Sequence, residues 1–224
     1  MVDSFEGRKR RAQRVVKKLK ELLPKAKIVL KYSNNLELLV AVILSAQCTD
    51  KKVNEVTAEL FKKYKTLDDY VKTSASRRTI EEFEQDIHSC GFFRSKTRTI
   101  LAIARIVQHR FGGKVPRTMK ELLTLPGVAR KTANVVLGNA YGVVEGIAVD
   151  THVIRLSQKL GLSQHKDPVK IEQDLMKLLP KKDWFFFTYG MIEYGRNVCP
   201  ARRHEDCKSH PLTKIYPKAA AIWP

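Results

Sequence analysis

The stretch from Leu125 to Val136, LPGVARKTANVV, limits the possible folds of this chain more than any other stretch does. Pro126 and Gly127 interrupt a helical pattern, and apolar residues resume at helical spacing from Ala133, which predicts two helices joined by a tight hairpin. Gly127 can adopt a positive φ and lets another backbone approach closely. The second helix would present unpaired amide N–H groups and the positive end of its dipole. The hairpin therefore predicts an anion site suited to a phosphate.

Lys131 stands close to the start of that second helix. The helix dipole disfavours a cation there, which favours the neutral amine that can act as a nucleophile. The simpler interpretation is another phosphate contact, because solvated lysines far outnumber catalytic ones. The residues alone leave both interpretations open.

The composition narrows the class of protein. With 224 residues and 43% hydrophobic content, the chain can bury a core as one domain or two small ones. Lys and Arg outnumber Asp and Glu by 42 to 23, and the net charge of +19 favours a polyanionic partner, with nucleic acid ahead of an acidic membrane. The apolar runs are too short to span a bilayer, and the basic N-terminus lacks the apolar run of a signal peptide. Four scattered cysteines do not suggest a secreted disulfide scaffold. We therefore expect a soluble, monomeric, cytoplasmic protein associated with the nucleoid and not with a membrane.

Apolar residues recur at helical spacing along the chain, and we find no strand pattern, internal repeat or low-complexity run. The first 31 residues hold 11 Lys or Arg against 3 acids above an apolar helical stripe. The sequence predicts an all-α fold. After the N-terminal helix and outside the hairpin, helices are expected at residues 36–46, 52–64, 66–72, 79–87, 97–111, 151–160 and 168–179.

The hairpin motif, followed by Ile147 to Arg155, IAVDTHVIR, closely resembles the endonuclease III family of helix-hairpin-helix DNA glycosylases with lyase activity. In that family the hairpin lysine attacks C1′ of the damaged nucleotide and the aspartate of the VDTH motif assists. The resemblance assigns these roles to Lys131 and Asp150. Asp150 is also well placed as the N-cap of the helix that follows it, and the two roles are compatible.

The resemblance also implies DNA contacts along the hairpin, at Gly127, Ala129, Arg130 and Thr132. Ala129 departs from the family pattern, which usually has Gly there, so the second position of the turn is less permissive.

Two further segments resemble the family. In Ser45 to Asp50, SAQCTD, the family's Gln enters the gap left by the displaced nucleotide, which implies that role for Gln47. The alternative is that Gln47 and Asp50 cap the junction between two helices. In Cys90 to Lys96, CGFFRSK, the family loop carries an apolar wedge.

The position of that wedge is Phe92, where an inserted aromatic would hold the duplex open. Arg94 and Lys96 would flank the loop as phosphate contacts. The alternative is that Phe92 and Phe93 are both core residues, and we expect this of one of them.

The tail departs from the family. Members usually carry a [4Fe–4S] cluster on four cysteines spaced C-x6-C-x2-C-x5-C, but after Cys199 only Cys207 follows. Two thiolates cannot hold that cluster in the usual way. We therefore expect no metal and no cofactor, with the loop held by packing. The alternative is a tetrahedral Zn²⁺ on Cys199, His204, Cys207 and His210, although their spacing matches no standard finger.

The expected function is that of a bifunctional DNA glycosylase and AP lyase. It would excise oxidised or ring-saturated pyrimidines from double-stranded DNA and nick the strand by β-elimination. The expected layout is an N-terminal helix in 1–35 that packs with the C-terminal lobe, a central helical barrel in 36–141, and the C-terminal lobe in 142–224. The alternatives are an abasic-site lyase with little glycosylase activity, an adenine-mismatch glycosylase, and a non-catalytic helix-hairpin-helix DNA-binding protein.

Overall fold

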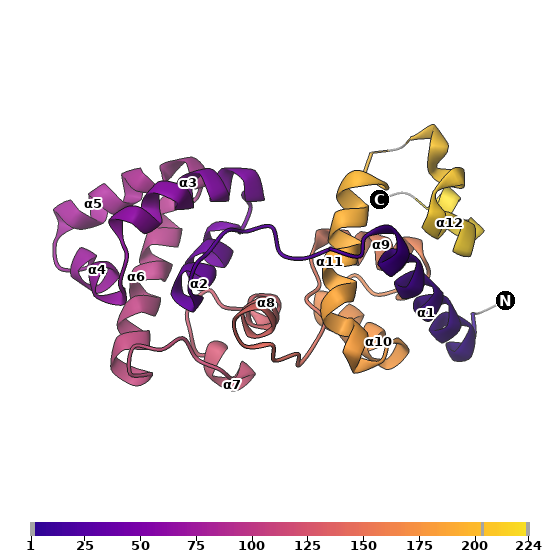
Figure 1. Cartoon of the computed structure of the whole chain (residues 1–224), viewed down its shortest axis with the longest axis horizontal. Helices are drawn as coiled ribbons and strands as arrows, with labels where there is room; N and C mark the ends of the chain where they lie inside the picture. Colours follow the sequence, from indigo (N-terminus) through magenta and orange to yellow (C-terminus); the bar gives the residue numbers. More distant parts are fainter. Residues whose placement is uncertain (1–2, 203, 223–224) are drawn as a thin grey trace. The chain divides into compact units, whose positions relative to one another are not determined.

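The computed structural model describes residues 3–202 and 204–222, and within these ranges it contains helices and no strand, so the predicted all-α class is confirmed (Figure 1). The described helices include none that is both long and apolar enough to cross a bilayer. The α-helices are α1 (Phe5–Leu22), α2 (Asn35–Leu44), α3 (Asp50–Lys63), α4 (Leu67–Thr73), α5 (Arg77–Asp86), α6 (Phe93–Arg110), α7 (Met119–Leu122), α8 (Arg130–Tyr141), α9 (Thr151–Lys159), α10 (Pro168–Leu178), α11 (Lys181–Asn197) and α12 (Pro211–Ile215). Short 3₁₀ helices lie at η1 (His88–Cys90), η2 (Glu205–Ser209) and η3 (Pro217–Ala221).

The chain forms two compact units. The hairpin unit comprises residues 29–143, and the terminal unit comprises residues 1–28 together with 144–224. The boundaries predicted from the sequence, after residues 35 and 141, lie close to these limits. The hairpin unit begins at residue 29 for a local reason. The amide of Lys31 donates to Oδ1 of Asn54 at 2.8 Å, and Nδ2 of Asn54 donates to the Val29 carbonyl at 2.9 Å. These bonds attach the segment before α2 to α3.

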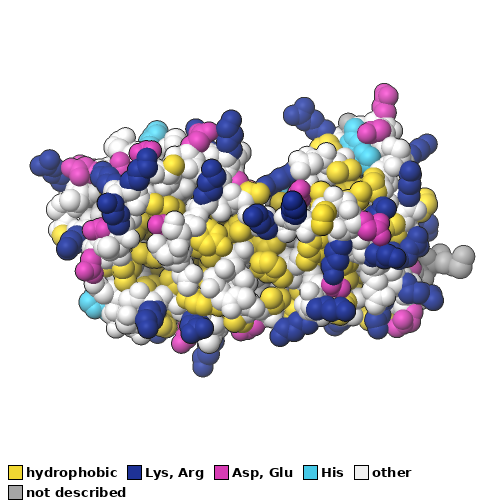
Figure 2. Space-filling model, viewed as in Figure 1, with side chains coloured by type: hydrophobic (Ala, Val, Ile, Leu, Met, Phe, Trp, Pro, Cys, Tyr) yellow, Lys and Arg dark blue, Asp and Glu magenta, His cyan; other side chains and the backbone are white. Residues whose placement is uncertain are grey.

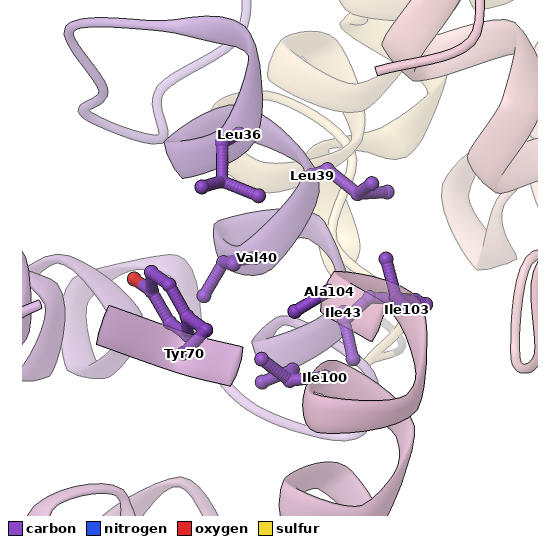
Figure 3. A pocket seen from close by; sticks show the side chains of 8 residues that line it. All are labelled: Leu36, Leu39, Val40, Ile43, Tyr70, Ile100, Ile103 and Ala104. Carbon is purple, nitrogen blue, oxygen red and sulfur yellow. The ribbon is translucent and has the colours of Figure 1, made fainter. Parts of the chain in front are cut away.

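The hairpin unit is built around α2. Every residue from Leu38 to Leu44 is buried, and a helix that is apolar on all sides must lie inside a core. It packs against α3, α6 and α8. Figure 3 shows side chains of α2 meeting those of α4 and α6 around a small apolar gap; they are Leu36, Leu39, Val40, Ile43, Tyr70, Ile100, Ile103 and Ala104.

The terminal unit joins the two ends of the chain. One face of α1 is buried through Ala12, Val15, Val16 and Leu19. These residues belong to a core that α9, α10, α11 and α12 complete, and α1 contacts the last three of these helices directly. The basic residues predicted over the same helix occupy its other faces, as expected for an amphipathic helix.

Helices α9 and α10 each begin with an aspartate as the N-cap residue. Oδ1 of Asp150 accepts the amide of Val153 at 2.8 Å, and Oδ1 of Asp167 accepts the amide of Lys170 at 2.9 Å. Each bond satisfies an amide that the first turn leaves without a backbone partner. The predicted N-cap role of Asp150 is therefore confirmed.

Leu19 and Leu22 give a matched test of the terminal core, because they lie on one helix with 0% and 40% of their surface exposed. Leu19→Ala should lower the free energy of unfolding by about 3 kcal/mol, since it leaves a cavity among packed side chains. Leu22→Ala should change it by less than about 0.5 kcal/mol. Urea denaturation of both variants measures the difference, and equal shifts would contradict the packing of α1.

Candidate functional site: the helix-hairpin-helix and its neighbouring cavity

The predicted hairpin joins α7 to α8. Ala129 is the N-cap residue of α8, and it provides no side-chain hydrogen bond to the first turn. The start of the helix is therefore open to an external anion, as the sequence predicted. Ala129 has φ −89°, which alanine adopts without strain, so the departure from the family's Gly is harmless to the turn.

Gly127 is required for two reasons. Its φ is +70°, a conformation that L side chains rarely adopt. A Cβ atom there would also lie 2.8 Å from Cγ2 of Thr99 on α6. The hairpin thus sits directly on α6, and only glycine permits this approach.

The side chain of Lys131 is exposed at the second position of α8. Arg130 before it and Thr132 after it are half-buried. The predicted nucleophile therefore lies on the surface at the open start of the helix, where a substrate can reach it.

A cavity of about 270 Å³ lies beside the hairpin, entirely within the hairpin unit. Its walls come from α2 and the turn after it, from the start of α6, and from both sides of the hairpin. The lining residues are Val42, Ile43, Ala46, Gln47, Phe92, Ser95, Lys96, Thr99, Gly127 and Thr132. Five of them are residues that the family resemblance singled out, although they lie far apart in the sequence. Ser95 lies in the Cys90–Lys96 motif without a predicted role, and Thr99 lies outside every motif; both line the cavity from α6.

Gln47 and Phe92 have unusual backbones. Within the described ranges they are the non-glycine residues with positive φ, at 52° and 50°. Each such conformation costs on the order of 1 kcal/mol and persists only where the surroundings enforce it. Phe92 is also 65% exposed, which is uncommon for a large aromatic. Strain combined with exposure points to a functional role for both side chains.

The alternative roles of Gln47 as a helix cap and of Phe92 as a core residue are wrong. Thr49, and not Gln47, caps α3, where its Oγ1 accepts the amide of Lys52 at 3.3 Å. Phe92 is not a core residue, whereas Phe93 is half-buried with its ring 4.5 Å from that of His88.

The predicted phosphate contact of Lys96 is wrong. We expected an exposed phosphate contact in a loop, but α6 begins at Phe93 and Lys96 is only 5% exposed. Its Nζ donates to the carbonyls of Leu44 and Cys90, both at 2.8 Å. Burial lowers the pKa of the Lys96 ammonium. Lys96 therefore joins the end of α2 to η1, and so fixes the segments that carry Gln47 and Phe92.

Arg94 lies in the first turn of α6 with 78% of its side chain exposed. Its Nε is 3.9 Å from a carboxylate oxygen of Glu84, a long surface contact of little energetic value. Arg94 is thus exposed, as its predicted phosphate contact requires, and the contact itself stays a prediction. Figure 2 shows Lys and Arg side chains projecting from the visible face of each unit, in agreement with the excess of basic residues in the sequence.

The remaining predicted site residues lie in the terminal unit. Asp150 caps α9 there. The ligand atoms of Cys199, His204, Cys207 and His210 all lie within 4.8 Å of one another. The structure thus gathers the four side chains that the sequence offered only as the alternative to a loop without metal.

The matching family model is that of the HhH-GPD superfamily base excision DNA repair proteins, over residues 40–181. Together with the helical fold and the hairpin, this match defines the class of the protein. Endonuclease III of Synechocystis sp. is 50% identical over 221 residues, which cover 99% of this chain and 98% of that protein. A solved structure described as a non-covalent endonuclease III–DNA complex is 42% identical, with a TM-score of 0.87 over 95% of this chain and 97% of that one. A trapped endonuclease III–DNA covalent intermediate gives the same values. The chain belongs to the endonuclease III family of DNA glycosylases and AP lyases.

Lys96→Met tests the buried ammonium, because methionine is of similar length and cannot donate a hydrogen bond. The two carbonyls lose their partner, so the free energy of unfolding should fall by about 3 kcal/mol. DNA binding should weaken as well, since the segments of Gln47 and Phe92 are released. Denaturation and DNA titration measure the two effects. The control is Lys52→Met, whose charge lies on the surface beside Glu55, and a Lys96 variant as stable as this control would contradict the role of Lys96.

Proposed function

We propose that Lys131 carries the glycosylase and lyase chemistry of this chain. The observation that carries the proposal is the exposed amine at the open start of α8, next in sequence to Thr132, which lines the cavity beside the hairpin. A neutral lysine amine in this place can act as a nucleophile. The helix start also attracts a phosphate of the DNA strand, which brings the neighbouring sugar to the amine.

The reaction proceeds by covalent catalysis. Nζ of Lys131 forms a bond to C1′ while the bond from C1′ to the damaged base breaks, and the base leaves with a proton. The sugar ring opens to a Schiff base, which acidifies the C2′ proton. Loss of that proton expels the 3′ phosphate by β-elimination, and water then releases the lysine.

Gln47 and Phe92 act on the stacked bases of the DNA and do not react with the sugar. Both side chains are exposed on strained backbones at the edge of the same cavity. An aromatic wedge and a polar side chain at this place would occupy the gap left by a displaced nucleotide. Arg94 and the open amides of α8 would bind the flanking phosphates.

Asp150 assists the reaction through its carboxylate group. Its carboxylate is half-buried, and one of its oxygens accepts an amide at the start of α9. The carboxylate can stabilise positive charge that develops on the sugar or accept a proton from Lys131.

The substrates are oxidised or ring-saturated pyrimidines and abasic sites in double-stranded DNA, and the protein acts where the chromosome lies. The sequence offers two thiolates after Gly195 in place of the four that the family's [4Fe–4S] cluster usually takes. We propose that this member works without that cluster.

A borohydride trap tests the nucleophile. Reduction of the Schiff base on abasic duplex DNA should leave a covalent adduct with the wild-type protein, and Lys131→Gln should abolish it. The control Lys120→Gln removes an exposed lysine of the same hairpin and should leave the adduct unchanged. An adduct with the Lys131 variant would assign the chemistry to another amine.

The same assay separates the alternative functions. An adduct on abasic DNA without one on a thymine-glycol duplex would indicate a lyase with little glycosylase activity. The absence of an adduct on either substrate, with DNA binding retained, would indicate a non-catalytic DNA-binding protein.

Asp150→Asn separates catalysis from capping, because asparagine caps a helix as well as aspartate does but carries no charge. The variant should unfold at nearly the wild-type temperature and process thymine-glycol DNA at least about 100-fold more slowly. Asp150→Ala removes the cap too and should lose a further 1 kcal/mol or so of stability. Single-turnover kinetics and thermal denaturation measure the two effects. Wild-type kinetics in the Asn variant would show that Asp150 serves only as a cap.

A further inference from the structure

The tail contains a group of four side chains whose chemistry the DNA reaction does not use. Cys199 follows α11, His204 and Cys207 lie at the start and within η2, and His210 precedes α12. Cys199 and Cys207 are each 2% exposed and His210 is 5% exposed, so the group is largely shielded from water. Their ligand atoms lie within 4.8 Å of one another.

This geometry does not fit the family's cluster. A [4Fe–4S] cluster takes four thiolates, each on a different iron, and this group offers two. A [2Fe–2S] centre with two cysteines on one iron and two histidines on the other would spread the pairs over two metal ions. In a single tetrahedral Zn²⁺ site, with bonds of about 2.0 to 2.3 Å, the ligand atoms lie roughly 3.3 to 3.8 Å apart. Distances in the observed group therefore need to shorten by at most about 1.5 Å around one ion.

His204 has the hydrogen bonding of a metal ligand. Its Nδ1 lies 2.7 Å from the carbonyl oxygen of Arg202. A carbonyl only accepts, so Nδ1 carries the proton and the lone pair of the neutral ring is on Nε2. A backbone carbonyl on the second nitrogen is the usual means by which metal-binding histidines are oriented.

His210 shows the same arrangement with a carboxylate. Its Nε2 lies 3.4 Å from Oδ2 of Asp206, whereas its Nδ1 is buried without a hydrogen-bond partner among the described residues. A buried ring nitrogen without a partner is costly unless something binds it. The carboxylate would hold the proton on Nε2 and direct the Nδ1 lone pair at an ion.

The two sulfur atoms also have polar neighbours. Nη1 of Arg155 points to Sγ of Cys199 at 3.8 Å, and its Nη2 donates to the carbonyl of the same residue at 2.6 Å. Sγ of Cys207 lies 4.0 Å from Oγ1 of Thr213. Polar neighbours of this kind commonly surround metal-bound sulfur atoms.

We propose that Cys199, His204, Cys207 and His210 bind one structural Zn²⁺ ion, with Nε2 of His204, Nδ1 of His210 and the two thiolates as ligands. The ion displaces one proton from each cysteine, so binding releases two protons and leaves the site electrically neutral. Four protein ligands fill the tetrahedron and leave no open position for catalysis. The ion would hold the tail in place where relatives use an iron–sulfur cluster, and the proposal is independent of the role of Lys131.

Metal analysis of the full chain, purified without a histidine tag, tests the proposal. One zinc per chain and no iron are expected, and a strong chelator should lower the melting temperature by several degrees, with recovery on addition of Zn²⁺. Cys207→Ser and His210→Asn should lose the zinc. Cys90→Ser, which alters a buried cysteine of the hairpin unit, and His165→Asn, which alters a half-exposed histidine, should retain it.

The visible absorption of bound Co²⁺ tests the proposal on the wild-type protein, even if the ligand variants fail to fold. Wild-type protein loaded with Co²⁺ should show the intense visible bands of tetrahedral cobalt bound to thiolates, and Zn²⁺ should remove them. Iron with labile sulfide in the purified protein would overturn the proposal in favour of a cluster. A metal-free protein that takes up neither Zn²⁺ nor Co²⁺ would overturn it in favour of a packed loop.

Discussion

The site of the hairpin unit depends on one buried cation. Nζ of Lys96 binds the carbonyl of Leu44 at the end of α2 and that of Cys90 in η1. A charged donor contributes roughly 1.5 to 3 kcal/mol per hydrogen bond. The positive-φ conformations of Gln47 and Phe92, just beyond those two carbonyls, cost a similar amount. The interaction therefore helps to hold two strained residues at the edge of one cavity.

A close contact with α6 fixes the position of the hairpin. Gly127 lets the turn touch Thr99 of α6, and α8 then starts at a defined place with no side-chain cap from Ala129. Helix α2 is buried on all sides and packs against both α6 and α8. The cavity is therefore lined by rigid helices. The proposed role of Lys131 as the nucleophile needs this rigidity, since a small misplacement reduces the rate of a covalent step severely.

The tail of the terminal unit is anchored by more than the four-residue group. The hydroxyl oxygen of Tyr194 accepts the amide of Leu212 at 3.2 Å. The guanidinium of Arg11 lies 3.9 Å from the centre of the Tyr216 ring and donates to the carbonyl of Gly161 at 2.8 Å. These contacts connect the tail to α1, α9 and α11, so a metal ion there would reinforce a fold that packing already defines. The proposed replacement of the family's usual cluster by a single ion would therefore need no change of fold.

The amino-acid pattern was sufficient for the helical class, the hairpin, the position of Lys131 near the start of a helix and the cap at Asp150, because these features depend on residues within about four positions of one another. The start of α6 was missed, since the left-handed conformation of Phe92 has no sequence signature. The burial of Lys96 was also missed, because one of its partners, Leu44, lies 52 positions away. The convergence of two cysteines and two histidines with irregular spacing was likewise decided by the packing of the tail. Local periodicity therefore determines the elements of this chain, whereas contacts between distant residues decide which side chains meet.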